Sequence, residues 1–163
     1  MLIRHAKAEA GDSHSDHDRP LTMRGEDDAW DMGFHMSMRN INPDAAIVSS
    51  AKRSRRTFEV WEEKAMSGLK PTFERALYLA SYETLLEHIA VLDDSLESPL
   101  IIGHNPGLSK LASELTDTRI QMRPIQFVHL TTELDTWQAA ATAGAWTLVR
   151  SWTKTDLQNP DLR

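Results

Sequence analysis

Two histidines stand directly after short apolar runs, and the first of them has an arginine beside it. The chain begins with Leu2-Ile3-Arg4-His5 after the initial methionine, and the run Leu100–Gly103 precedes His104. If both runs are strands of a parallel sheet, their carboxyl ends meet at one edge, where α/β proteins place their ligands. A guanidinium group binds phosphate oxygens in a planar fork. The pattern therefore points to a site for a phosphoryl group.

Further anion-binding groups are expected at the same edge of the sheet. Asn105 is a good helix N-cap and Pro106 fits a first helical turn, so the second histidine would lie beside a helix N-terminus, which favours an anion. A third apolar run ends at Ser49, and a basic run, residues 52–56, follows it. Arg53 lies in the first turn of the helix that this basic run opens. Its side chain can therefore reach back over the sheet edge.

The elements that must position these groups alternate between strand and helix. Apolar residues recur at helical spacing after Thr22, a plausible N-cap, after Ser50, within Tyr82–Asp93, and from Leu108 to Leu115. The alternation predicts a three-layer α/β/α sandwich with a mainly parallel sheet. The last two strands have no helical pattern between them and are expected to form an antiparallel C-terminal pair. The expected strands are Leu2–Arg4, Asp44–Ser49, Thr72–Glu74, Leu100–Gly103, Phe127–Leu134 and Gly144–Trp152.

Length and composition limit the possible classes of protein. The chain has 163 residues, of which 40% are hydrophobic, so we expect a single domain over residues 1–152 and a polar, fraying C-terminal tail over residues 153–163. The net charge of −6 argues against a nucleic-acid partner. The absence of cysteine excludes thiol chemistry. The apolar runs are too short to cross a membrane and no signal-peptide pattern opens the chain, so a cytoplasmic protein without a membrane partner is expected.

Four segments in order resemble one protein family. Arg4-His5-Ala6 resembles the Arg-His-Gly/Ala signature of the histidine phosphatase superfamily, whose fold is called phosphoglycerate mutase-like. Three further segments narrow the resemblance to the phosphohistidine phosphatases of the SixA type. Those segments are Arg19-Pro20-Leu21-Thr22-Met23-Arg24-Gly25, Val48–Thr57, and Gly103-His104-Asn105-Pro106-Gly107.

The resemblance implies a division of roles among the predicted site residues. His5 is the nucleophile that becomes phosphorylated, and Arg4, Arg53 and His104 hold the phosphoryl oxygens. Neighbouring cations suit such a nucleophile, because they lower the pKa of the histidine and keep it neutral. They also neutralise charge that develops in phosphoryl transfer. Neither a metal nor another cofactor is expected.

Three more residues receive weaker assignments. Arg19 and Asn105 are expected to contact the phosphate or the substrate. Glu83 is the candidate general acid, because it lies near a helix start where members of the superfamily place a carboxylate. A purely structural role is equally open, since an acidic residue in the first turn stabilises a helix. The tract His14–Asp18 contains metal-ligand residue types, but it is predicted to be a flexible polar loop.

The predicted activity is hydrolysis of phosphohistidine on a protein through a phosphorylated His5. The expected partners are a phosphohistidine-bearing protein or a small phosphorylated substrate, and phosphate or sulfate is an expected occupant of the site. Short intervals between the motifs leave no room for a lid, which favours a protein substrate. A small-molecule phosphomonoesterase or mutase of the same superfamily is the alternative. A non-catalytic phosphoprotein-binding module is a second alternative, although a binding module does not need a nucleophile.

Overall fold

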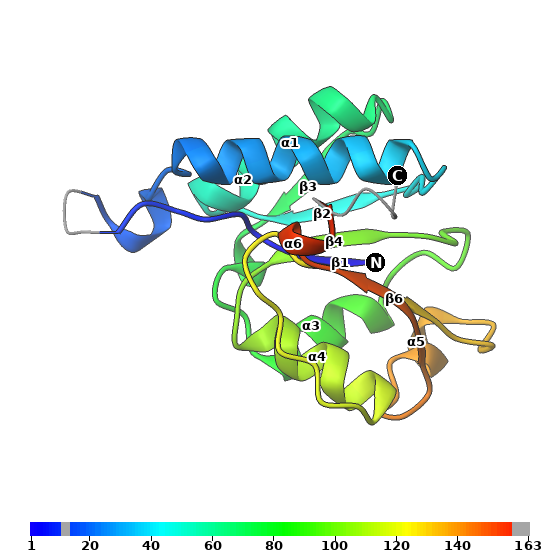
Figure 1. Ribbon diagram of the computed structural model, residues 1–163. Coiled ribbons are helices and arrows are strands. Elements are labelled where there is room, and N and C mark those ends of the chain that lie inside the picture. The colour runs from blue at the N-terminus through cyan, green and yellow to red at the C-terminus, as the bar shows by residue number, and fades with distance from the viewer. Residues whose placement is uncertain (11–13, 158–163) are drawn as a thin grey trace.

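One six-stranded sheet carries the structure, a computed structural model that describes residues 1–10 and 14–157 (Figure 1). The strand order is β3-β2-β4-β1-β5-β6. The first four strands in this order are parallel, whereas β5 runs antiparallel to β1 and to β6. The mainly parallel sheet and its antiparallel C-terminal pair were both predicted, and the structure confirms them. The strands are β1 (Leu2–Arg4), β2 (Ala46–Ser49), β3 (Pro71–Glu74), β4 (Leu100–Gly103), β5 (Phe127–Thr131) and β6 (Thr147–Trp152).

Helices cover both faces of this sheet and complete the three layers. One face carries α1 (Met23–Ser37), α2 (Lys52–Ala65) and the short α6 (Lys154–Leu157). The other face carries α3 (Tyr82–Ala90), α4 (Gly107–Thr116) and the short α5 (Trp137–Ala140). Two 3₁₀ turns, η1 (Asp16–Asp18) and η2 (Arg75–Leu77), lie in the connections. Within the described ranges, no helix is long and apolar enough to cross a membrane.

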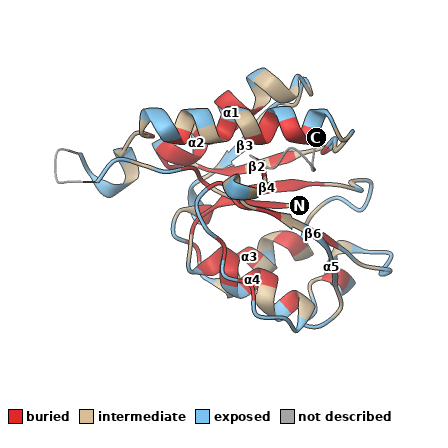
Figure 2. Cartoon of the chain, in the orientation of Figure 1, coloured by how far each residue is buried: buried red, intermediate tan, exposed pale blue. Residues whose placement is uncertain are grey.

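The strands divide their side chains between two cores, one on each face. Successive residues of a strand point to opposite faces. Accordingly, Ile3 and Ile102 pack beneath α1 and α2, while Leu2 and Ile101 pack against α3 and α4. Figure 2 shows the buried residues along the central strands and the inner sides of the helices. Because β1 and β4 are covered on both faces, the loops that leave their ends have firmly fixed starting points.

The helix α1 forms as the sequence predicts. The Thr22 side chain caps it by accepting a hydrogen bond from the Gly25 backbone N–H at 3.0 Å. At Gly33, an added Cβ would lie 2.4 Å from the Trp61 carbonyl oxygen of α2. The two helices thus approach each other at backbone distance. The predicted apolar stripe is buried, and it consists of Ala29, Met32, Gly33 and Met36.

Two short helices near the C-terminus were not predicted. α5 lies between β5 and β6, where no helical pattern was seen, and both strands are shorter than expected. α6 falls within the segment expected to fray, yet Leu157 is buried in the core beneath α1. The domain therefore continues at least to residue 157. The remainder of the predicted tail, residues 158–163, lies outside the described residues, as do residues 11–13 of the polar loop.

Candidate active site

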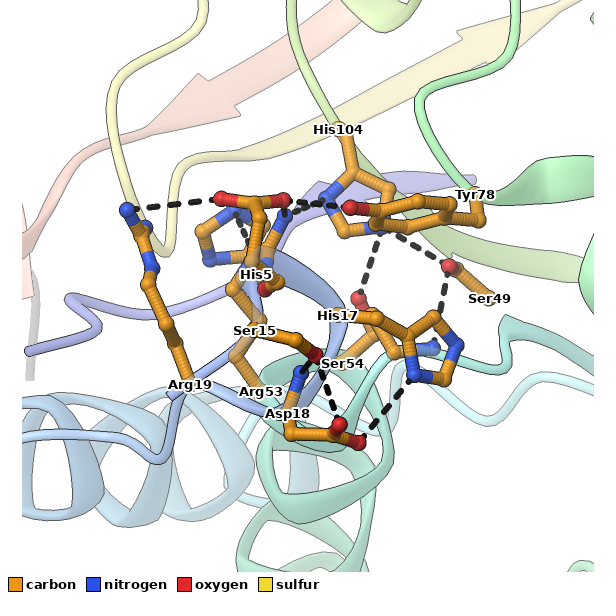
Figure 3. Close-up of polar contacts among 12 residues, drawn as sticks. His5, Ser15, His17, Asp18, Arg19, Ser49, Arg53, Ser54, Tyr78 and His104 are labelled. Atoms are coloured by element: carbon orange, nitrogen blue, oxygen red, sulfur yellow. Dashed lines mark hydrogen bonds and ion pairs between the residues drawn. The ribbon is translucent and has the colours of Figure 1, made fainter. Parts of the chain in front are cut away.

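Three neighbouring parallel strands end at one edge of the sheet, and each delivers a polar side chain there. His5 follows β1, Ser49 ends β2, and His104 follows β4. The His5 backbone N–H donates to the Gly103 carbonyl at 3.0 Å, which ties the ends of β1 and β4 together. The two imidazole rings lie with their centroids 4.9 Å apart. The two predicted histidines therefore share one site, with Arg53 beside them (Figure 3).

His5 is held as one neutral tautomer. Its Nδ1–H donates to the Ala6 carbonyl at 2.7 Å, and its Nε2 accepts from Arg53 Nε at 3.2 Å. Since a carbonyl only accepts and a guanidinium only donates, the proton is assigned to Nδ1 and the lone pair to Nε2. Burial lowers the pKa of His5 to about 4, and the charges of Arg53, Arg4 and Arg19 add to this effect. The imidazole is therefore neutral at pH 7, with Nε2 able to act as a nucleophile.

Arg53 is the central cation of the site. It lies in the first turn of α2 and only 2% of its surface is exposed. Beyond its bond to His5, its Nη2 lies 3.4 Å from His104 Nδ1. Thr57 joins α2 to the loop after β1, because its Oγ1 donates to the Arg53 carbonyl at 2.7 Å and accepts from the Ala6 N–H at 3.0 Å. The guanidinium and the nucleophile are thus fixed relative to each other.

His104 is also neutral, and it carries its proton on the other nitrogen. Its Nδ1 faces Arg53, so the proton is assigned to Nε2, which lies 2.7 Å from Ser49 Oγ. Ser54 Oγ lies farther from the same nitrogen, at 3.4 Å. The pKa of His104 is lowered to about 3 by burial and by the neighbouring His5 and Arg53. Ser49 is a contact that the sequence analysis did not assign.

Two further arginines bring unused donors to the site. Arg4 Nη1 donates to the Met122 carbonyl at 3.1 Å, and Arg19 Nη1 lies 3.4 Å from Asp16 Oδ1. The Nε atoms of both arginines are buried, and neither has a hydrogen-bond partner among the described residues. Burial and the charge of Arg53 lower the pKa of Arg4. Buried donors of this kind are suited to an anionic acceptor.

Sequence reasoning missed two residues that meet at Arg53. Asp16, in η1, accepts hydrogen bonds at Oδ2 from Arg53 Nη2 at 3.0 Å and from the Tyr78 hydroxyl at 2.5 Å. Its pKa is lowered, first by the Tyr78 hydrogen bond and then by Arg53 and Arg19. Tyr78 also places its ring edge-on to His104, with centroids 5.6 Å apart. Asp16 lies in a three-residue 3₁₀ turn and Tyr78 directly follows another, and such turns are too short for a periodic pattern to reveal these residues.

Asn105 does not occupy the predicted N-cap position. α4 begins at Gly107, and the residue in the cap position is Pro106. The Asn105 amide donates to the Met122 carbonyl and accepts from Ser109 Oγ, each at 2.8 Å. Asn105 therefore fastens the loop before α4 to the segment around residue 122, and its described contacts do not reach the histidines.

Glu83 lies in the first turn of α3 as predicted, but its described contacts do not include the histidines. Its carboxylate lies 3.4 Å from Lys110 Nζ, and its side chain is 64% exposed. Its pKa is lowered by hydrogen bonds from its own backbone and from Ser81. A general acid needs a proton near neutral pH, which requires the opposite shift. These observations favour the structural role of Glu83.

The assembled side chains can hold a small, highly charged oxyanion. The guanidinium groups of Arg53 and Arg19 contact the Asp16 carboxylate, and Arg53 also contacts both neutral imidazoles. Such donors match the tetrahedral oxygens of a phosphoryl group. Across the described part of the chain, no group of three or more histidine, aspartate or glutamate side chains is arranged to hold a metal ion.

Comparison with known proteins shows the family and the fold of this chain. The model of the histidine phosphatase superfamily (branch 1) matches residues 1–78. An uncharacterized protein of Mycobacterium tuberculosis is 34% identical over 112 residues, which are 68% of this chain and 67% of that protein. The SixA structure from Nakamurella multipartitia has a TM-score of 0.80 at 24% identity and covers 93% of this chain and 94% of its own. The structure of the protein histidine phosphatase SixA complexed with tungstate has a TM-score of 0.82 at 21% identity. This match covers 96% of this chain and 97% of that one. The chain belongs to the histidine phosphatase superfamily.

Proposed function

We propose that this protein is a phosphatase that removes the phosphoryl group from phosphohistidine on a protein substrate. In this proposal His5 carries the phosphoryl group as a covalent intermediate, and no metal takes part. The observation that carries the proposal is the fixed tautomer of His5: Nδ1–H is bonded to Ala6, and the lone pair of Nε2 faces the buried Arg53. A cytoplasmic location belongs to the same proposal.

The reaction has two displacements at phosphorus. In the first, the Nε2 lone pair of His5 attacks the phosphorus and the bond to the substrate nitrogen breaks. The substrate ring, protonated on its other nitrogen, keeps that electron pair and departs as neutral imidazole. In the second, a water oxygen attacks the phosphorus of phospho-His5, and the P–N bond breaks. A proton from this water is released, and inorganic phosphate leaves. Arg53, Arg4 and Arg19 neutralise the oxygens in both transition states.

Arg53 must change its hydrogen bonds during the first displacement. Its Nε–H points at the His5 lone pair in the free protein. Once that lone pair forms a bond to phosphorus, the N–H can move to a phosphoryl oxygen attached to the same nitrogen. The N–H has to move only from the His5 nitrogen to an oxygen of the phosphoryl group bonded to that nitrogen. This small movement favours a role for Arg53 in phosphoryl transfer.

A phosphohistidine substrate is supported by the absence of a suitable acid among the groups that contact His5. Imidazole is an acceptable leaving group, whereas an alkoxide needs a proton. The described partners of His5 are Ala6, Arg53 and His104, and none of them is an acid that holds a proton at neutral pH. The solved relative that carries tungstate is named a protein histidine phosphatase, and this supports both the substrate class and an oxyanion as occupant.

The test is to trap the phosphorylated intermediate. The protein is mixed with a radiolabelled phosphohistidine protein and quenched in alkali, where phosphohistidine is stable. We expect label on the wild type and no label on His5→Ala. The matched control His88→Ala, in the last turn of α3, should be labelled like the wild type. His104→Ala should retain slow labelling, since it supplies a binding group and not the nucleophile.

Substrate choice is tested with the same preparations. We expect turnover of the phosphohistidine protein to exceed that of a phosphoserine peptide and of sugar phosphates. Faster turnover of a sugar phosphate would identify a small-molecule phosphatase instead. Binding of the phosphoprotein without any label or released phosphate would identify a binding module.

A further inference from the structure

The carboxylate of Asp16 occupies the donors that the proposed function assigns to the phosphoryl group. Oδ2 accepts from Arg53 Nη2 at 3.0 Å and from the Tyr78 hydroxyl at 2.5 Å, while Oδ1 lies 3.4 Å from Arg19 Nη1. The Asp16 backbone carbonyl also accepts from Arg53 Nη1. Figure 3 draws the side-chain contacts of Arg19, Arg53 and Tyr78 in this cluster.

These contacts leave Arg53 little capacity for a substrate. Its Nε–H is directed at His5, and both of its terminal nitrogens are directed at Asp16. A phosphoryl group on His5 Nε2 would need the same planar fork of donors. A carboxylate and a phosphoryl group both present negatively charged oxygens to that fork. Asp16 and the substrate therefore compete for Arg53.

The two partners of this ion pair differ in how easily they can move. The Arg53 side chain is 2% exposed, whereas the Asp16 side chain is 48% exposed. The η1 turn is fastened independently of Asp16, because Ser15 Oγ donates to Asp18 and His17 Nε2 lies 2.9 Å from Ser50 Oγ. The Asp16 side chain can thus rotate into water and release Arg53 Nη2, while the turn stays in place and its carbonyl keeps the bond from Arg53 Nη1.

We propose that Asp16 is an internal competitor that closes the oxyanion site until a phosphoryl group displaces it. The inference rests on the proposed function, since it takes the arginine cluster to be the phosphoryl site. A phosphoryl dianion carries more charge than a carboxylate and can also use the buried Nε–H groups of Arg4 and Arg19. Phosphoryl groups displace Asp16 for these reasons, whereas the carboxylates of other ligands do not.

Asp16 as general acid is the competing interpretation, and the contacts oppose it. Its oxygens accept hydrogen bonds from the Tyr78 hydroxyl and the Arg53 guanidinium and pair with Arg19, and these contacts lower its pKa. A carboxylate held in its ionised form has no proton to give at neutral pH. The two interpretations predict opposite effects on anion binding, so one measurement separates them.

The experiment measures the dissociation constant of inorganic phosphate by calorimetry for four folded proteins. These are the wild type, Asp16→Asn, Asp16→Ala and the control Asp18→Asn. Asp18 belongs to the same turn and carries the same charge, but its described side-chain contacts are with Ser15 and His17. If Asp16 closes the site for nine-tenths of the time, both Asp16 variants should bind phosphate about tenfold more tightly than the wild type. Asp18→Asn should change the constant less than about twofold.

The outcomes separate this inference from the proposed function. Equal tightening by Asp18→Asn would assign the effect to general electrostatics and overturn the competitor. Unchanged or weaker phosphate binding in both Asp16 variants, with His5 still labelled by phosphohistidine, would overturn the competitor and leave the phosphatase standing. If none of the four proteins binds phosphate and His5 takes no label, both proposals fail.

Discussion

Ser49 contacts His104 at the ring nitrogen that faces away from Arg53. Nδ1 of His104 accepts from Arg53 in the free protein, so it must gain a proton before it can donate to a phosphoryl oxygen. A hydroxyl can either accept from Nε2–H or donate to Nε2. Ser49 therefore supports both tautomers of His104, and we infer that it is a positioning residue for the change between them.

This role predicts the effect of Ser49→Ala. Removing the 2.7 Å contact should lower the rate of phosphoryl transfer by up to about 100-fold, the loss typical of a misplaced catalytic group, with little change in KM. The matched control is Ser54→Ala, because Ser54 lies 3.4 Å from the same nitrogen and should cost much less. Steady-state kinetics on a phosphohistidine protein give both constants. If Ser49→Ala and Ser54→Ala lowered the rate equally, Ser49 would not be a positioning residue.

At the scale of the elements, the contact between α1 and α2 depends on a glycine. A Cβ at Gly33 would lie 2.4 Å from the Trp61 carbonyl, which is backbone and cannot rotate away. Alanine is favoured over glycine inside a helix by about 1 kcal/mol. Forcing an extra carbon into a packed contact costs about 1–3 kcal/mol. We therefore expect the steric cost to exceed the gain in helix propensity.

Gly33→Ala should accordingly lower the free energy of unfolding by up to about 2 kcal/mol. Urea denaturation followed by circular dichroism measures this change. Asp27→Ala, at an exposed position of the same helix, should stay within about 0.5 kcal/mol of the wild type. A stabilised Gly33→Ala variant would mean that α1 moves away from α2 without cost.

The elements also show what the sequence could and could not predict. The strand β4 was predictable because it is a continuous buried apolar run, and the helix α1 because burial imposes an apolar period over several turns. The helices α5 and α6 have four residues each, which is too short for a period to emerge. In the site, His5 and His104 follow predictable strands. Asp16 and Tyr78 form a hydrogen bond although they are 62 positions apart in the chain. A contact between such distant positions cannot be predicted from the local sequence.

At the scale of the whole molecule, the two buried histidines link stability to pH. Their pKa values are lowered in the folded state to about 4 for His5 and about 3 for His104, against 6.5 for an ordinary histidine. Between these values the unfolded chain binds more protons than the folded protein, so folding loses stability as the pH falls. Carboxylates such as Asp16, whose pKa is lowered, add to this loss of stability only at lower pH.

We therefore expect these two histidines to make the free energy of unfolding fall from about pH 6.5 towards pH 4. Each of the two histidines contributes a slope of up to about 1.4 kcal/mol per pH unit. Chemical denaturation at a series of pH values measures the slope. In His5→Ala the slope should decrease, whatever the variant does to stability at pH 8. An unchanged slope would show that His5 is not held neutral by the fold.

Hydrogen-bonded strands lie about 4.8 Å apart, and the centroids of the His5 and His104 rings, which follow the paired strands β1 and β4, are 4.9 Å apart. The gap between the two imidazoles thus matches the spacing of the backbone ladder that carries them, and contacts with Ala6, Arg53 and Ser49 hold the rings in place. Substitutions in either core can change stability without resizing this gap. Changes in the surrounding loops can admit different leaving groups while the width offered to the transferred group stays constant. Selection for a new substrate would therefore act on the loops and leave the size of the reacting group unchanged.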